Sequence, residues 1–423
     1  MHRQGRLADA LAGYERHLAM NSDDASALFL AGTACLQLRD LPAAEDWLKQ
    51  AAVLAPDVAE IHSNLGMVQG ARGRHDDAIE SFRRALVLRP DFAEAFNNLG
   101  EALWRLGRRQ EAIDAYRQAI GIDPGLAAAQ NNLGVALRED SHTATAEAAF
   151  RAALDSDPAF GDAHSNLCSL LLELRRPVAA LAACDAYLDY HPGHSGALAF
   201  RVAALLQAGR VGAADALMSV DKLLQVDMIE PPPGYAGIAA FNSDLAAQIL
   251  ADSSLTVRPG GDATRLGIHT GNLADGRGGP VGLLEAMIRR AAQRYIGNID
   301  MPTDHPFHCL SSDVIGRIDI WSVIMERGGH ELPHLHAEAW LSGVYYARIP
   351  PSVTAAANGG SGWIGFGRPP DIFPLPQPAA IHWLRPEAGK MLLFPSYLFH
   401  ETVPLAGDDQ RISLAFDIFH RET

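Results

Sequence analysis

The first half of the chain repeats one pattern of apolar, small and turn-forming positions. Proline returns every 34 residues, and glycine and alanine keep the same period at two other positions. Because apolar residues recur between these points at helical spacing, each unit is predicted to form two amphipathic helices joined by a short turn. The residues in register are Pro56, Pro90, Pro124, Pro158 and Pro192; Gly32, Gly66, Gly100 and Gly134; and Ala44, Ala78, Ala112, Ala146, Ala180 and Ala214.

Residues 91–124 show how one such unit is built. Gly100 and Ala112 let the two helices approach closely. Gly107 favours the turn between the helices, and Pro124 ends the second one. One pair of helices cannot bury its apolar face alone, so the units are expected to stack into an α-solenoid. Full units begin at Ala25, Ala59, Ala93, Ala127 and Gly161, and a degenerate unit begins at Ser195.

The period and the small residues of residues 91–124 resemble the tetratricopeptide repeat. The resemblance implies a helical repeat array that recruits a protein or peptide. Near the start, Gly5, Ala10 and Tyr14 fit the second helix of a repeat whose first helix is missing. Either a half-repeat opens the array, or the protein starts further upstream.

An asparagine also keeps this period, standing just before a Leu-Gly or Leu-Cys step in four successive units. Asparagine is a mediocre helix former, so packing alone gives little reason for it. A ladder of amides along the first helices can bind an extended peptide backbone, and it resembles the asparagine ladder of the O-linked N-acetylglucosamine transferase repeats. The alternative is hydrogen bonding between helices within the array. The residues are Asn64, Asn98, Asn132 and Asn166.

Two cysteines also fall on repeat positions. Cys168 stands where other units have a small residue, and Cys184 stands where they have an aromatic one. Two buried core thiols are therefore expected, with a redox switch as the alternative. The chain has four cysteines and no CxxC pair, which fits a reducing cytoplasm better than a disulfide framework or a zinc ribbon.

After about Gln225 the helical period gives way to a different pattern. Three consecutive prolines within residues 229–234 cannot continue a helix and indicate a linker. Helical spacing returns up to about Leu250 and again over residues 282–295. Beyond these helices, β-branched and aromatic runs between Gly and Pro clusters are typical of an antiparallel sandwich or barrel. The predicted strands are residues 318–325, 340–349, 363–366, 391–394 and 412–419.

Length and charge limit the classes of function. A chain of 423 residues suggests two or three domains, and the change of pattern gives two, residues 1–228 and 229–423. Lys and Arg number 35 against 50 Asp and Glu, and the net charge of −15 disfavours nucleic acid and anionic membranes as partners. No apolar run of about 18 residues and no secretory leader is recognisable, so a cytoplasmic protein is expected.

The candidate chemistry lies around the predicted strands. His334 and His336 directly precede one strand, and their spacing of two places both imidazoles on one side of an extended chain, where they can share a metal. His400 follows at the end of a later strand, in the segment FPSYLFHETVP. Arg411 and Ser413 then share one face of the last strand.

This order of residues resembles the iron(II)- and 2-oxoglutarate-dependent oxygenases, which are built on a double-stranded β-helix, or jelly-roll. The resemblance spans about residues 230–423 and is closest to bacterial oxygenases fused to tetratricopeptide repeats. It is carried by the segments LPHLHAEAWLSGVYYARIP, LLFPSYLFHETVP and RISLAFDIF, and by TRLGIHTGNL at residues 264–273.

The resemblance implies Fe(II) as cofactor, with 2-oxoglutarate and O₂ as co-substrates. Arg411 would hold the distal carboxylate of 2-oxoglutarate, because its planar guanidinium can donate two parallel hydrogen bonds. Ser413 and Tyr346 would add hydroxyl hydrogen bonds to that carboxylate. No catalytic side chain is implied beyond the metal ligands. The implied iron ligands are His334, His336 and His400.

His336 departs from the usual ligand set, because most of these enzymes have a carboxylate at that position. Three arrangements stay open. The site has three histidines; or Glu338 supplies the carboxylate, with His336 and His400; or His336 stands outside the ligand set. Trp340 and Trp363 are expected in the core rather than as a platform for the substrate.

The two resemblances together imply an oxygenase that hydroxylates a protein or peptide side chain, with prolyl, asparaginyl or aspartyl side chains as the natural targets. The repeat array would raise the local concentration of that substrate at the iron. Two alternatives belong to other classes. One is a catalytically inactive scaffold for protein–protein interaction, and the other is a small-molecule oxygenase whose repeats mediate assembly.

Overall fold

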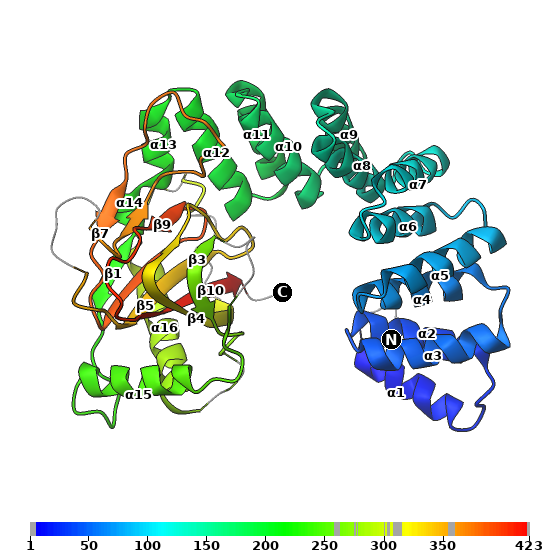
Figure 1. Cartoon of the computed structure of the whole chain (residues 1–423), viewed down its shortest axis with the longest axis horizontal. Coiled ribbons are helices and arrows are strands. Elements are labelled where there is room, and N and C mark those ends of the chain that lie inside the picture. The colour runs from blue at the N-terminus through cyan, green and yellow to red at the C-terminus, as the bar shows by residue number, and fades with distance from the viewer. Residues whose placement is uncertain are drawn as a thin grey trace. The chain divides into compact units, whose positions relative to one another are not determined.

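The computed structural model describes residues 6–257, 263–274, 276, 278–299, 301–302, 305–307, 315–353 and 360–420. The chain forms two compact units, Met1–Asn166 and Leu167–Thr423, and the boundary falls inside helix α10 (Gly161–Glu173). A helical repeat array precedes an antiparallel sheet domain with flanking helices, so the predicted fold class is confirmed (Figure 1). The predicted domain boundary at residues 228 and 229 stays a prediction.

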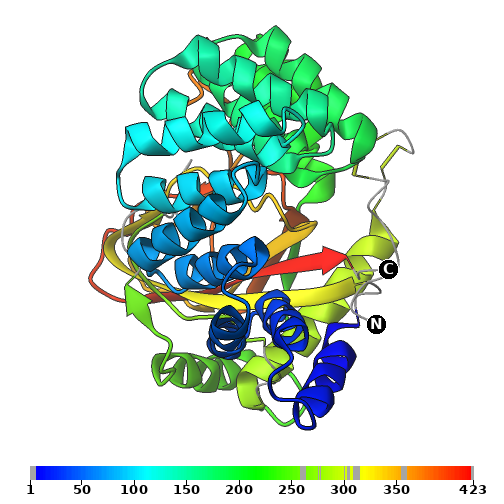
Figure 2. The same ribbon diagram turned by 90° about the vertical axis from the view of Figure 1, so that its right-hand side faces the viewer.

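The first unit consists of helices that stack as antiparallel pairs, coloured blue to cyan in Figure 2. Each pair occupies one 34-residue unit of the sequence, and the single helix α1 precedes the first pair. The helices are α1 (Leu7–Leu18), α2 (Ala25–Gln37), α3 (Leu41–Leu54), α4 (Ala59–Ala71), α5 (His75–Leu88), α6 (Ala93–Arg105), α7 (Arg109–Ile122), α8 (Ala127–Glu139) and α9 (Thr143–Ser156).

The repeated glycine of each first helix lies against a large side chain of the second helix. A Cβ atom at Gly100 would stand 2.5 Å from the ring of Tyr116, and one at Gly134 would stand 2.5 Å from the ring of Phe150. Both rings are buried. The glycine is therefore required because the aromatic ring fills the space that any side chain would need.

The turn between the paired helices contains one left-handed residue, and it recurs with the same period. Glycine takes this conformation without steric cost, and Gly73 and Gly107 occupy it in two units. The next residue donates a backbone hydrogen bond to the last turn of the first helix, as Arg108 does to Leu103, which is the Schellman arrangement. The left-handed residues have φ from 55° to 75°: Arg39, Gly73, Gly107, Ser141, Arg175 and Gly209.

The second unit begins with the last repeat helices and continues into the sheets. These helices are α11 (Pro177–Tyr190), α12 (Ser195–Gln207), α13 (Val211–Met218) and α14 (Val220–Leu223). They are hydrogen-bonded to the sheet domain: Ser195 Oγ donates to the Ala339 carbonyl at 2.7 Å, and Tyr397 Oη donates to the Leu217 carbonyl at 2.9 Å. The last repeats and the sheets therefore pack as one body.

Two antiparallel sheets face each other in this unit. The larger sheet has the strand order β1-β8-β5-β10-β4-β3-β2, and the smaller has the order β7-β6-β9. The strands are β1 (Gln225–Met228), β2 (Thr256–Val257), β3 (Thr264–His269), β4 (Ile315–Glu331), β5 (Leu341–Arg348), β6 (Ile364–Phe366), β7 (His382–Leu384), β8 (Lys390–Pro395), β9 (His400–Thr402) and β10 (Arg411–His420).

All five predicted strands are present, as β4, β5, β6, β8 and β10. The sequence pattern did not predict β1, which follows the last repeat helix and pairs with β8 at one edge of the larger sheet. Its alternation of half-buried and exposed residues is short and lacks a continuous apolar run. Strands β2, β3, β7 and β9 were missed for a similar reason, since most of them have two or three residues.

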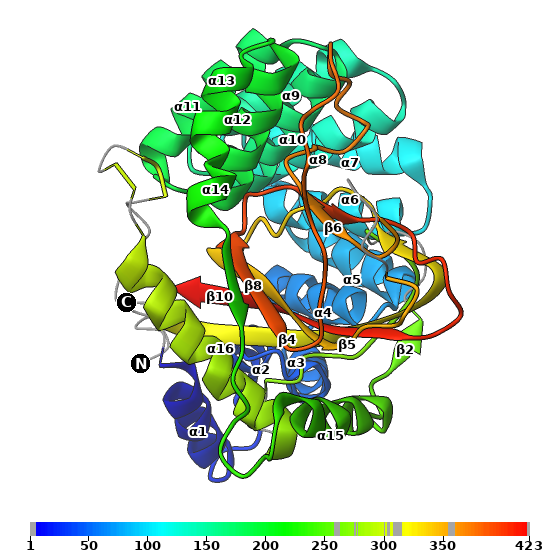
Figure 3. The same ribbon diagram turned by 90° about the vertical axis from the view of Figure 1, so that its left-hand side faces the viewer.

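Two helices cover the larger sheet, α15 (Ile238–Leu250) against β5 and α16 (Gly279–Asn298) against β4 (Figure 3). Tyr345 links the layers, because its Oη donates to Asn242 Oδ1 at 2.6 Å. Both helices were predicted from their apolar spacing. Among the described residues no helix is long and apolar enough to cross a membrane, and the cytoplasmic location stays a prediction.

Candidate metal centre

The structure brings His334, His336 and His400 together. His334 and His400 form an isolated antiparallel bridge, in which each backbone N–H donates to the other's carbonyl, at 3.0 Å and 2.9 Å. Their ring centroids lie 4.2 Å apart, and those of His336 and His400 lie 5.3 Å apart. One ligand atom from each ring lies within 4.8 Å of the other two. The segment between β4 and β5 and the start of β9 therefore hold three imidazoles around one point.

Hydrogen bonds fix how each ring is turned. Nδ1 of His334 donates to the Leu332 carbonyl at 2.8 Å, and Nδ1 of His400 donates to the Leu398 carbonyl at 3.1 Å. Carbonyl oxygens only accept, so the proton of each ring is assigned to Nδ1. The Nε2 lone pairs are then available to a metal ion.

The third ring is turned by a carboxylate. His336 Nδ1 lies 2.6 Å from Asp417 Oδ1, and the same oxygen accepts a hydrogen bond from Ser342 Oγ at 2.6 Å. Ser342 is in turn hydrogen-bonded to Ser396 at 2.7 Å. Such carboxylate–histidine pairs orient metal ligands in many proteins and raise their basicity.

The pKa values of the three imidazoles differ because their surroundings differ. Burial holds the pKa of His400 well below its ordinary value, and it also lowers the pKa of His334. Burial acts downward on His336 too, but the hydrogen bond and charge of Asp417 outweigh it and raise the pKa. His334 and His400 are therefore kept in the neutral form that binds metal ions.

A cavity of about 310 Å³ connects the imidazoles with Arg411 on β10. Arg411 is only 2% exposed. It donates to the Gly362 carbonyl at 3.0 Å and contacts the Met325 sulfur at 2.8 Å, and both partners are neutral. Within the described residues Arg411 has no carboxylate partner, and its Nε has no hydrogen bond. A buried cation without an anion is costly, so this end of the cavity favours an anionic ligand.

Ser413 and Tyr346 line the same cavity and lie directly opposite each other on β10 and β5. Both side chains are buried. Burial raises the pKa of Tyr346, so its hydroxyl stays protonated and can donate a hydrogen bond. Residues 264–273, singled out as a motif in the sequence, include β3, and Thr264 and His269 from that strand also reach the cavity.

Glu338, the alternative carboxylate ligand, lies elsewhere. Its side chain is exposed and lines a separate cavity of about 1220 Å³ that His194 and Arg289 also line. His336, by contrast, lies within the group of three imidazoles. Of the three arrangements left open by the sequence, the geometry therefore favours the one with three histidines.

Two residues at the centre were not found from the sequence. Asp417 shares the face of β10 with Arg411 and Ser413, so the two-residue period of that strand could have pointed to it. Trp321 on β4 lines the cavity, and its ring centroid lies 5.5 Å from that of His336. Trp340 is buried and stacks on Phe307 in the core, as predicted. Trp363 is half-buried and does not line the cavity.

The asparagine ladder lies in the first unit, and its amides are half-buried. Hydrogen bonds between helices account for part of it, because three of the four amides donate to a polar side chain of the preceding first helix. In the described part of the chain, the Oδ1 atoms of those three accept no hydrogen bond, so peptide binding stays a prediction. The three bonds are Asn64 to Thr33 (2.9 Å), Asn132 to Asn97 (3.0 Å) and Asn166 to Asn131 (2.9 Å). The fourth ladder residue, Asn98, instead accepts a hydrogen bond from Asn97 at 3.3 Å.

Family comparisons agree with this geometry. The family described as "Putative 2OG-Fe(II) oxygenase" matches residues 319–417, which contain the three imidazoles, Arg411 and Asp417. Tetratricopeptide repeats match residues 3–59, 64–127 and 131–195. This chain therefore combines tetratricopeptide repeats with a domain that matches the family described as "Putative 2OG-Fe(II) oxygenase". Both resemblances seen in the sequence are thereby confirmed.

Several solved structures are similar to part of this chain. MamA is 25% identical, with 37% of this chain and 92% of that chain covered and a TM-score of 0.35. The structure titled "Functional Characterization of Pseudomonas Aeruginosa pilF" is 22% identical, with coverages of 47% and 90% and a TM-score of 0.41. YrrB, titled "a TPR protein with an unusual peptide-binding site", is 22% identical, with coverages of 44% and 95% and a TM-score of 0.35. No curated protein matches the chain.

Proposed function

We propose that residues 229–423 form an Fe(II)- and 2-oxoglutarate-dependent dioxygenase, and that it hydroxylates a protein or peptide side chain recruited by the repeats. One observation carries this proposal: the buried guanidinium of Arg411, which has no carboxylate partner among the described residues, shares a cavity with three imidazoles whose Nε2 atoms are available. The first feature fits a carboxylate ligand, and the second fits a divalent metal. A metal beside a carboxylate-binding arginine is what a 2-oxoglutarate site requires.

The donor set suits Fe(II). Imidazoles are ligands that suit this ion, and three of them occupy fewer positions than it offers, so 2-oxoglutarate and O₂ could bind as well. His334, His336 and His400 would hold the ion. When bound, the iron would supply the redox chemistry that couples the decarboxylation of 2-oxoglutarate to succinate with insertion of one oxygen atom into a C–H bond.

The protein's own residues orient the reactants. Arg411 would bind the distal carboxylate with its guanidinium fork, while Ser413 and Tyr346 would add hydroxyl hydrogen bonds from the two opposed strands. Asp417 and the carbonyls of Leu332 and Leu398 would keep the three Nε2 atoms aimed at the ion. Because Arg411, Ser413 and Tyr346 are buried, water has little access to the co-substrate.

The repeat half supports recruitment of an extended peptide. Three asparagine side chains of the ladder, Asn64, Asn132 and Asn166, each keep an Oδ1 acceptor available within the described residues. A cavity of about 470 Å³ beside the ladder is lined by Asn98, Met67 and Arg105, which combine an amide, an exposed apolar side chain and a cation. Such a surface can bind peptide backbone and side chains together.

Turnover of the co-substrate tests the oxygenase. With Fe(II) and 2-oxoglutarate under anaerobic conditions, the protein should develop a weak visible charge-transfer band, and in air it should form succinate. His400→Ala should abolish both. His382→Ala is the matched control, because this histidine side chain is 46% exposed and lies 3.8 Å from the carboxylate of Asp221, away from the three imidazoles. Absence of band and succinate in the wild-type protein would favour the inactive scaffold.

Product analysis tests the substrate class. Proteins captured through the repeats should be incubated with Fe(II), 2-oxoglutarate and air, and then searched by mass spectrometry for peptides heavier by one oxygen atom. Replacing Asn64, Asn98, Asn132 and Asn166 together by Ala should abolish capture and modification but leave uncoupled succinate formation intact. Unchanged capture by that variant would remove the asparagines from the proposal. Turnover on small molecules alone, with no modified protein, would favour a small-molecule oxygenase.

A further inference from the structure

One repeat replaces both members of the contact that joins its two helices. In the three units directly before it, a glycine of the first helix lies against an aromatic ring of the second, as in the pairs Gly100–Tyr116 and Gly134–Phe150. The unit of α10 and α11 has Cys168 and Cys184 at these positions. Cys168 and Cys184 are fully buried, so the prediction of buried thiols is confirmed. Another cysteine, Cys309, lies outside the described residues.

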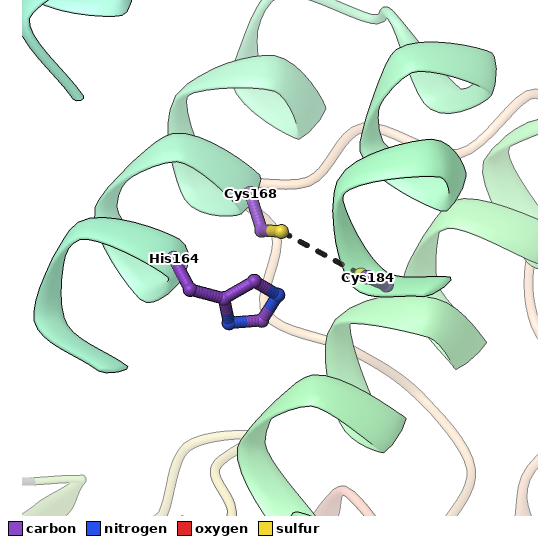
Figure 4. Close-up of side chains that lie close together, drawn as sticks. All are labelled: His164, Cys168 and Cys184. Atoms are coloured by element: carbon purple, nitrogen blue, oxygen red, sulfur yellow. Dashed lines mark hydrogen bonds between the residues drawn. The ribbon is translucent and has the colours of Figure 1, made fainter. Parts of the chain in front are cut away.

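The two sulfurs lie 3.5 Å apart, and a histidine accompanies them (Figure 4). His164 precedes Cys168 by four residues on α10, so one helical turn places both side chains on the same face. Figure 4 shows the imidazole beside the two thiols, and one ligand atom from each residue lies within 4.8 Å of the others. All three residues are fully buried.

The donors of this cluster select a particular class of cation. Thiolates and imidazole favour soft or borderline ions, of which Zn²⁺ is the divalent example that prefers four-coordinate sites. Two thiolates and a neutral imidazole carry a charge of −2, so Zn²⁺ would give a neutral complex, which is the least costly form to bury. Tetrahedral coordination with Zn–S bonds of about 2.3 Å separates two sulfurs by about 3.8 Å, close to the separation in the structure.

We propose that His164, Cys168 and Cys184 form a structural Zn²⁺ site that joins α10 to α11. The site is separate from the candidate iron centre, whose donors are imidazoles only. Zinc would take over the role of the missing glycine–aromatic contact. Since the site is fully buried, the ion would enter as the repeat folds and would leave slowly.

Cobalt substitution tests the proposal, because Co²⁺ bound to thiolate gives a near-ultraviolet charge-transfer band that an all-histidine site cannot give. The full chain, with the three imidazoles of the iron centre replaced by Ala, should be refolded with Co²⁺ under reducing conditions. The expected result is one Co²⁺ per chain with the thiolate band, and displacement by Zn²⁺. His164→Gln should weaken binding by about tenfold or more.

Cys35→Ala is the matched control, because Cys35 is also a buried helical thiol of the array but lies outside the cluster. It should keep the band, whereas Cys168→Ala and Cys184→Ala should lose it. If the alanine variants do not fold, the band and the zinc-dependent rise in Tm of the parent chain still decide the matter. No thiolate band in the refolded parent, or a Cys168–Cys184 disulfide found by mass spectrometry in the protein as purified, would overturn the proposal.

Discussion

Two buried charges, one in each half of the chain, have the same exposure and opposite surroundings. Glu45 in α3 and Arg411 in β10 are each 2% exposed. Glu45 contacts Lys49 Nζ at 2.6 Å and Arg74 Nη2 at 2.5 Å, and it also contacts Arg72. Arg411 contacts a backbone carbonyl and a thioether sulfur, both neutral.

Glu45 therefore has the surroundings of a charge that stabilises the fold, and Arg411 has those of a charge that binds a ligand. A buried carboxylate that the protein itself neutralises stabilises the fold only while its partners remain, and removing one member leaves an uncompensated charge. A buried cation that borders a cavity, with no anion among the described residues, is instead suited to a ligand. Glu45 should therefore matter for stability and Arg411 for turnover.

The largest expected effect comes from Arg411→Ala. It removes charge-assisted hydrogen bonds to the co-substrate, so succinate formation at low 2-oxoglutarate concentration should fall by more than about 100-fold. 2-Oxoglutarate with Mn²⁺ should raise the Tm of the wild-type protein but not that of the variant. Arg327→Ala is the control, because that side chain is 66% exposed and pairs with Asp408 at the surface. Wild-type turnover by Arg411→Ala would contradict the assignment.

Asp417→Asn should have the next largest effect. Asp417 is a partly buried charge with a third kind of surroundings, because its partner is the imidazole of His336. The variant should weaken Mn²⁺ binding by about 10- to 100-fold, measured by calorimetry without oxygen, because His336 loses the group that orients it. Asp408→Asn, at an exposed surface pair, should bind Mn²⁺ as the wild type does. Equal affinities for both variants would argue against a positioning role for Asp417.

Glu45→Gln should lower stability and leave turnover unchanged, whereas Arg411→Ala is expected to lower turnover. Two arginines and a lysine lose their common anion, so the free energy of unfolding should fall by about 2 kcal/mol, while succinate formation stays unchanged. Urea unfolding followed by far-ultraviolet circular dichroism measures the first quantity. Glu101→Gln, in a half-exposed pair with Arg105, should change the unfolding free energy by less than about 0.5 kcal/mol.

The smallest effect is the pH dependence that Glu45 confers. The hydrogen bond and charge of Arg74, assisted by Lys49, lower the pKa of Glu45 from 4.5 to about 2. Its contribution is therefore complete above pH 4.5 and should be lost as the pH falls toward 2. The difference in unfolding free energy between wild type and Glu45→Gln should shrink over that range. A difference that grows on acidification would show that Glu45 does not act through its charge.

The repeats were easy to predict because their determinants are local and recur. Gly100 predicts the ring of Tyr116 opposite it from the period alone, since both residues lie within one unit. The partners of Glu45 were harder to find, because Arg72 and Arg74 belong to the next unit along the chain. Contacts within a repeat can be read from its pattern, whereas contacts between repeats require the stacking.

At the candidate metal centre, the order of the motifs predicted which residues come together. It did not predict the hydrogen bonds that orient their side chains. His334 and His336 share one segment, while His400 and Arg411 lie on two others, and only their order and flanking strands pointed to a common site. The role of Asp417 depends on the fold, because His336 lies 81 residues before it and reaches it through the pairing of β10 with β5. Glu338 looked suitable as a ligand by its distance from His336 in sequence, yet it lines another cavity.

The position of strand β1 restricts where the repeat array of this protein could be replaced by another. The strand follows directly on the last repeat helices, yet it completes the edge of the sheet beside β8. Cutting the chain after residue 228 would expose the edge of β8, and an unpaired edge invites pairing between molecules. It would also remove Ser195 and Leu217, which are hydrogen-bonded to the sheet domain. A junction between a different repeat array and this sheet domain should therefore lie within the repeats. The last repeat helices would then stay joined to the sheets with which they are hydrogen-bonded.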